Sequence, residues 1–146
     1  MILFTDSDVE LHYKPSKIIH MKRIIHTTNA PEAVGPYSQA VEINGTLYIS
    51  GQIPVDPETG KVVEGGIKEQ TEQVMKNTGA LLNEAGYDFS DVVKCTCLLT
   101  DMDNFKTMNE VYAGYYPKDA PARAAYGVVK LPLGVLIEIE TIAVKK

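Results

Sequence analysis

The last strand-like segment, residues 135–144, is apolar on both of its faces, and this feature constrains the fold most. Its two alternating faces read Val135, Ile137, Ile139, Thr141 and Ala143 on one side, and Leu136, Glu138, Glu140, Ile142 and Val144 on the other. Successive strand residues point to opposite faces of a sheet, so both faces need cover. Helices are expected on one face. A partner subunit is expected on the other, because apolar residues alternate there with carboxylates. The segment therefore predicts an oligomer with a site near its interface.

The rest of the chain supplies the other layers of this fold. Periodicity and turn residues predict strands at 23–27, 37–43, 46–50, 92–100 and 123–131, and helices at 67–85 and 103–115. Asn44-Gly45 is a hairpin signal, and Leu131-Pro132-Leu133-Gly134 is expected to join the last two strands through a type I turn. This order predicts an α+β fold, a mixed sheet with two helices packed on one face.

Composition and the chain start limit the class of protein. The 146 residues fit one domain, and a net charge of -5 without a Lys/Arg cluster argues against nucleic-acid binding. No apolar run reaches the ~20 residues of a membrane span, and no signal-peptide layout is present, so we expect a cytoplasmic protein. Residues 1–20 are aperiodic and precede Met21, which reads like a second start. We expect an N-terminal extension at 1–20, or alternatively a packed arm, and one domain at 21–146.

The two cysteines, Cys95 and Cys97, are expected to be reduced core thiols. A disulfide across one intervening residue is strained, and the His residues that a zinc site would need lie far off in the N-terminal segment. We therefore expect no metal site.

Arg123 is the residue best suited to bind a small anion. It lies between small residues, and its guanidinium fork matches a carboxylate bidentately. A structural ion pair, for example with Glu140, is an equally supported alternative. If the last two strands form a hairpin, Arg123 and Glu138 share a face about four residues apart, roughly 13 Å at ~3.3 Å per residue. That spacing leaves room for a small ligand between them.

Four other residues are candidates for a binding site. Gly51 follows a strand and lets its backbone N–H approach an anion, Ser50 offers a hydroxyl, and Tyr37 offers a phenol. Asn109 borders a helical apolar stripe. Taken singly, each is more often structural, and Ser50 lacks the His partner of a hydrolase triad.

Five strings together resemble one family. They are Gly35-Pro36-Tyr37-Ser38-Gln39, Ser50-Gly51-Gln52-Ile53-Pro54, Asn109-Glu110-Val111-Tyr112, Pro121-Ala122-Arg123 and Ile137-Glu138-Ile139-Glu140. Their order and separations resemble the YjgF/RidA family of enamine/imine deaminases over residues 21–146. The resemblance implies a chorismate-mutase-like fold and a homotrimer with its sites between subunits.

The same resemblance implies roles at the matched positions. Arg123 would bind the substrate carboxylate, and Glu138 would hold or activate water and shuttle protons. Tyr37, Ser50, Gly51 and Asn109 would line the pocket. Many members have Cys at the position of Ala125, so only its backbone N–H could contact a ligand here.

The implied reaction needs no cofactor. It hydrolyses 2-iminobutanoate or 2-iminopropanoate, products of pyridoxal-phosphate enzymes, to a 2-keto acid and ammonia. Two alternatives stay open: an endoribonuclease or translation inhibitor, and a non-catalytic trimer that binds small metabolites.

Overall fold

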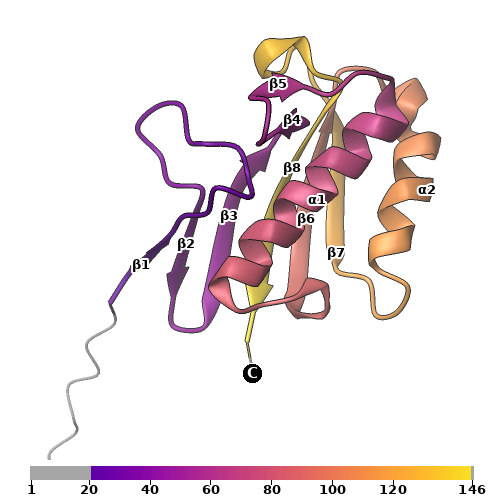
Figure 1. Cartoon of the computed structure of the whole chain (residues 1–146). Helices are drawn as coiled ribbons and strands as arrows, with labels where there is room; N and C mark the ends of the chain where they lie inside the picture. Colours follow the sequence, from indigo (N-terminus) through magenta and orange to yellow (C-terminus); the bar gives the residue numbers. More distant parts are fainter. Residues whose placement is uncertain (1–20, 146) are drawn as a thin grey trace, which may run out of the picture.

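A mixed sheet of six strands forms the centre of the molecule, and two helices lie across one of its faces (Figure 1). The computed structural model describes residues 21–145, so the expected extension at 1–20 lies outside the described residues. The elements of the two layers are β1 (Arg23–Ile25), β2 (Ala40–Ile43), β3 (Thr46–Gln52), α1 (Ile67–Ala85), β6 (Val92–Leu99), α2 (Phe105–Tyr115), β7 (Ala122–Gly127) and β8 (Ile137–Val144). In space the strands follow the order β1-β2-β3-β8-β6-β7.

Shorter elements connect these layers. Strands β4 (Val55–Asp56) and β5 (Lys61–Val62) pair with each other on either side of residues 57–60. Short 3-10 turns occupy η1 (Phe89–Asp91), η2 (Met102–Asn104) and η3 (Pro132–Gly134). The hairpin predicted at Asn44-Gly45 is confirmed, because both residues have the positive φ, 53° and 74°, that a type I′ turn requires.

Helix α1 has the predicted bounds, and its ends show why. At its start the Gly66 N–H donates to the Glu69 carboxylate at 2.9 Å, which pairs one of the free backbone donors there. At its end Gly86 takes the left-handed conformation, φ 81°, which favours glycine and closes the last turn. Between them the stripe that includes Val74, Leu81 and Leu82 packs on the sheet.

The predicted two-faced character of the last strand is confirmed. Ile137, Ile139 and Ala143 of β8 are fully buried under the helices. Cys95 and Cys97 of β6 point into the same core as free thiols, as predicted.

The predicted hairpin between the last two strands is wrong. β7 pairs in parallel with β6 at the sheet edge, and β8 lies antiparallel between β3 and β6. The reason is helix α2, which carries the chain from the end of β6 back to the start of β7, the crossover that parallel strands need. The turn type also differs, because Leu133 has φ 56° and ψ 13°, as at the third position of a type II turn.

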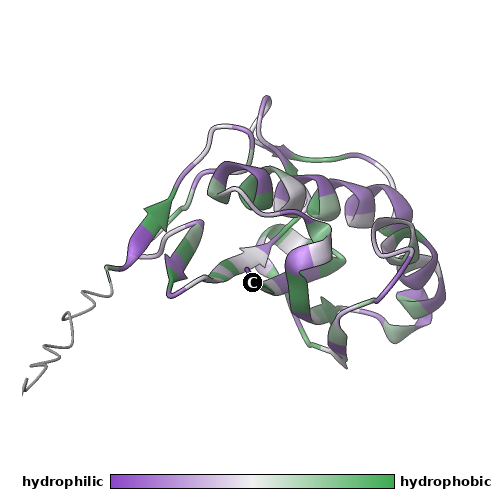
Figure 2. Ribbon diagram, turned by 90° about the horizontal axis from the view of Figure 1, so that it is seen from below, coloured by the Kyte–Doolittle hydropathy of each residue, from purple (hydrophilic) through white to green (hydrophobic). Residues whose placement is uncertain are grey.

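No other element of residues 21–145 covers the sheet face away from the helices (Figure 2), and this face is partly apolar. Tyr48 of β3 and Tyr126 of β7 are 49% and 57% exposed on it, and Val144 is also exposed. Strand register places Glu138 and Glu140 on this same face, since Glu138 and Tyr126 both pair with Leu98. We call this surface the open face.

Candidate functional site

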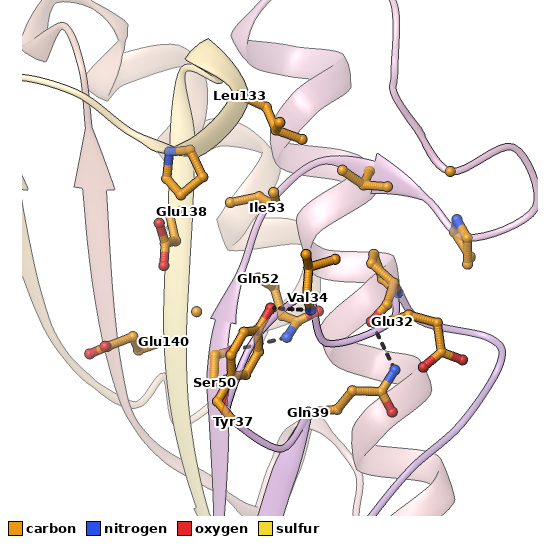
Figure 3. Close-up of a pocket in the computed structure, with 16 residues that line it drawn as sticks. Glu32, Val34, Tyr37, Gln39, Ser50, Gln52, Ile53, Leu133, Glu138 and Glu140 are labelled. Atoms are coloured by element: carbon orange, nitrogen blue, oxygen red, sulfur yellow. Dashed lines mark hydrogen bonds between the residues drawn. The ribbon is translucent and has the colours of Figure 1, made fainter.

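A pocket of about 750 Å³ at the open face brings together four of the predicted site residues, Tyr37, Ser50, Gly51 and Glu138 (Figure 3). They come from the loop before β2, from β3 and from β8. Apolar residues close the other side of the pocket, among them Ile53, Val55 and Leu133. The pocket therefore combines carboxyl and hydroxyl groups with an apolar wall.

Glu138 lies directly over the backbone of Gly51. A Cβ added to Gly51 would lie 1.8 Å from Glu138 Oε1 and 2.8 Å from its Cδ, so only glycine leaves room for this carboxyl. The β3–β8 register shifts between Ile49 and Gln52, where this close approach occurs. The register shift in β3 and the lack of a side chain at Gly51 thus together make room for the Glu138 carboxyl group.

Burial holds the pKa of Glu138 above its ordinary value, and the negative charge of Glu140 raises it further. Glu138 and Glu140 both line the pocket from β8, and the Glu140 carboxylate extends away from Tyr37 and Ser50 (Figure 3). A carboxyl with a raised pKa exchanges its proton nearer to neutral pH, which suits a group that both takes and gives protons.

The loop that carries Tyr37 is held by a buried amide. Gln39 donates to the carbonyls of Thr27 and Pro31 at 3.0 and 2.8 Å, and its Oε1 accepts the Thr27 N–H at 2.8 Å. Ser50 Oγ donates to the Ser38 carbonyl at 2.7 Å, which ties the same loop to β3. These bonds fix the loop at the pocket mouth.

Arg123 does not share a face with Glu138, so that prediction is wrong. In the observed register Arg123 pairs with Cys95, whose side chain points to the helices, whereas Glu138 lies on the open face. The two residues are three positions and two strands apart, roughly 10 Å in each direction at the usual strand spacings. The predicted hairpin placed the last two strands side by side, whereas in the structure β6 lies between them.

Arg123 instead lies against helix α2. Its guanidinium carbon is 4.7 Å from the ring centroid of Tyr112 and 5.4 Å from that of Phe105. Asn109 is four residues after Phe105 and three before Tyr112, so it lies on the same side of α2. Ala125 follows Arg123 by two positions on the edge strand. Arg123, Asn109 and Ala125 thus form a second group, apart from the pocket.

The alternative for Arg123, a structural ion pair with Glu140, is not formed. Within residues 21–145 the ion pairs of the structure are Arg23 with Glu42 and His26 with Glu32. The described residues also contain no group of three or more His, Cys, Asp or Glu side chains arranged to hold a metal. Among them, no helix has the length and apolar character of a membrane span.

Comparison with known proteins places this arrangement in a family. The family model described as Endoribonuclease L-PSP matches residues 27–145. The chain belongs to this family. A RutC family protein of Pyrococcus horikoshii is 54% identical over 126 residues, which are 86% of this chain and 100% of that protein.

Two further similar proteins carry Rid-type names. The Mus musculus protein named 2-iminobutanoate/2-iminopropanoate deaminase is 52% identical over 125 residues, which are 86% of this chain and 93% of the mouse protein. The structure of YyfA from Yersinia pestis, described as a protein of unknown function of the conserved Rid protein family, has a TM-score of 0.82 at 48% identity. The structural match covers 86% of this chain and 100% of YyfA. The predicted YjgF/RidA membership and its chorismate-mutase-like fold are confirmed.

Sequence reasoning missed several residues of the pocket. Glu140 was treated as a possible ion-pair partner, and Gln39 and Ile53 were quoted only as parts of motifs. The motif strings were a usable signal, because Gln39 and Ile53 both stand inside them. Leu133 had no such signal, since it reaches the pocket through the turn after β7.

Proposed function

We propose that the chain is a hydrolytic deaminase that converts 2-iminobutanoate and 2-iminopropanoate to the 2-keto acid and ammonia. The observation that carries this proposal is the carboxyl of Glu138, partly buried over Gly51 in a pocket with an apolar wall. The identity with the mouse deaminase supports the choice of substrate.

The chemistry suits a site without a cofactor, because an imine carbon is already electrophilic. Water adds to that carbon, the C=N electron pair moves to nitrogen, and Glu138 takes a proton from the water. Glu138 then protonates the nitrogen of the tetrahedral adduct. The hydroxyl proton of the adduct then passes through Glu138 to the resulting amine, so that the C–N bond breaks, ammonia leaves and the C=O bond forms. Positioned acid–base groups of this kind accelerate a reaction by about 10²–10⁴-fold.

Arg123 is proposed to bind the substrate carboxylate, with Asn109 and the backbone N–H of Ala125 beside it. Its guanidinium has no carboxylate partner among residues 21–145, so its charge is free to pair with a ligand. A fork of N–H donors facing a carboxylate gives both affinity and orientation.

One chain cannot place Arg123 and Glu138 on one small ligand, since they lie on opposite faces of the sheet. We therefore propose a homotrimer whose sites lie between subunits. One copy would supply Tyr37, Ser50, Gly51 and Glu138, and its neighbour Arg123, Asn109 and Ala125. The partly apolar open face with Tyr48 and Tyr126 is the surface that such a partner would cover.

The test is release of 2-ketobutyrate from 2-iminobutanoate, generated by a threonine dehydratase with semicarbazide as the competing imine trap. The parent should divert imine from the trap to 2-ketobutyrate. Arg123→Ala should abolish nearly all of the enzymatic 2-ketobutyrate release, because loss of one partner of a buried charged pair costs about 2–5 kcal/mol. Parent-like turnover by Arg123→Ala would show that the site is assigned to the wrong residue.

The family description also names an endoribonuclease. A net charge of -5 disfavours binding of the RNA phosphate backbone. We therefore expect that a preparation that hydrolyses 2-iminobutanoate does not cleave RNA. The buried free thiols Cys95 and Cys97 support a reducing compartment, and we propose the cytoplasm.

A further inference from the structure

The guanidinium of Arg123 lies over two aromatic rings that one helix supplies. Phe105 and Tyr112 are seven residues apart on α2, which puts them on one face of the helix, toward β7. The centroid distances of 5.4 and 4.7 Å are both within the ~6 Å range of a cation–π contact. The rings therefore fix where this cation lies.

Two titratable neighbours of the Arg123 guanidinium are uncharged at neutral pH. Burial raises the pKa of Cys97 to about 12, so it stays a thiol at neutral pH. Burial also raises the pKa of Tyr112, which stays a phenol. Among residues 21–145, the aromatic contacts of Arg123 thus leave its positive charge without an ion-pair partner.

The rings are themselves held in place. The Tyr112 and Tyr116 centroids are 4.7 Å apart, and Tyr116 packs edge-on against Phe89 at 5.6 Å. The Tyr112 hydroxyl is buried and has no hydrogen-bond partner among the described residues. Tyr112 therefore acts on Arg123 through the face of its ring and not through its hydroxyl.

We propose that Phe105 and Tyr112 form an aromatic clamp that positions Arg123 for substrates with a carboxylate group. The clamp rests on the proposed role of Arg123 and adds two positioning residues to it. A flat guanidinium held by rings presents its donors in one plane, which matches a carboxylate. An unstacked arginine would have to lose its side-chain freedom on binding.

The test compares three variants of the full chain. Tyr112→Leu removes the ring, and Tyr112→Phe keeps the ring while removing the hydroxyl. Tyr115→Leu is the matched control, because the Tyr115 ring packs on Phe89 at 5.2 Å on the same helix. We expect Tyr112→Leu to raise both KM for the imine and Kd for 2-ketobutyrate about tenfold, the size of one partly desolvated cation–π contact. Its kcat should stay within about twofold, because Glu138 is untouched.

Tyr112→Phe and Tyr115→Leu should both keep the parent KM and Kd. A Tyr112→Leu variant with the parent KM and Kd would overturn the clamp, as would a loss of kcat and thermal stability at unchanged KM. If the parent binds 2-ketobutyrate in calorimetry but hydrolyses no imine, the proposed activity is contradicted. The clamp is then still tested by comparing the Kd values of the parent and the Tyr112 variants. A parent that binds no 2-ketobutyrate contradicts both.

Discussion

Gly51→Ala is the change that most directly perturbs the proposed proton-transfer group. The new Cβ would lie 1.8 Å from Glu138 Oε1, and an ordinary contact begins at 3.4 Å, so the oxygen must retreat by about 1.6 Å. The atom that moves is the far end of a flexible side chain. Gly51 has no positive φ, so alanine suits its backbone. We therefore expect the fold to survive and the carboxyl to be displaced.

The cost to catalysis follows from that displacement. Misplacing a catalytic group by about 1 Å can cost ~10²-fold in rate, which is of the order of what a positioned acid–base group contributes. Gly51→Ala should therefore lower kcat about 100-fold. The melting temperature should stay within a few degrees of the parent, because no core side chain is removed.

The coupled 2-ketobutyrate assay measures the loss, with thermal unfolding alongside it. Gly114→Ala is the matched control, since a Cβ there meets nothing within 4 Å. Alanine in the helix should slightly stabilise α2 and leave kcat unchanged. If Gly51→Ala keeps the parent kcat, the carboxyl of Glu138 does not need its place over Gly51, and the reasoning is refuted.

Two further predictions concern stability. The raised pKa of Glu138 means that the folded chain binds this proton more tightly than the unfolded chain, whose carboxyl has the ordinary pKa of 4.5. The contribution of this proton to folding stability is fully present below pH 4.5, and it is lost as the pH rises through the pKa of Glu138 in the folded chain. The melting temperature of Glu138→Gln should therefore exceed that of the parent at pH 8, and the difference should shrink toward pH 4. A difference in melting temperature that does not depend on pH would count against this reasoning. Gln39→Leu should destabilise the fold by about 1–3 kcal/mol in urea unfolding and raise KM, because it leaves the buried Thr27 N–H unpaired and frees the Tyr37 loop. A parent-like midpoint would contradict that role.

Local patterns in the sequence predicted the elements well. The 67–85 helix has a clear apolar stripe and a glycine stop, and both signals act within the helix itself. The alternation in 135–144 likewise identified the buried face, because side-chain direction in a strand depends only on parity. The prediction of free thiols at Cys95 and Cys97 rested on another local signal, the strain of a disulfide across one intervening residue.

Strand neighbours were not predictable in this way. Alternation tells which face a residue lies on within its own strand but not which strand lies beside it. Arg123 and Glu138 were therefore assigned to one face through a hairpin that does not form. The helix between 99 and 122 was the better signal, because a strand–helix–strand segment favours parallel pairing.

The pocket depended on contacts between strands. The resemblance indicated Tyr37, Ser50, Gly51 and Glu138 together, but nothing in the chain order reveals that Gly51 is small because Glu138 crosses it. The clamp on Arg123 was hidden for the same reason, since Tyr112 alone reads as a core residue of an apolar stripe.

Subunit complementation tests most directly whether each site is shared between two copies. Arg123→Ala and Glu138→Gln chains are each purified, unfolded, mixed in equal amounts and refolded, and imine hydrolysis is measured. If a site takes Arg123 from one copy and Glu138 from its neighbour, random trimers carry about one quarter intact sites, and activity should recover to about one quarter of the parent. A mixture no more active than the two separate variants would contradict the shared site.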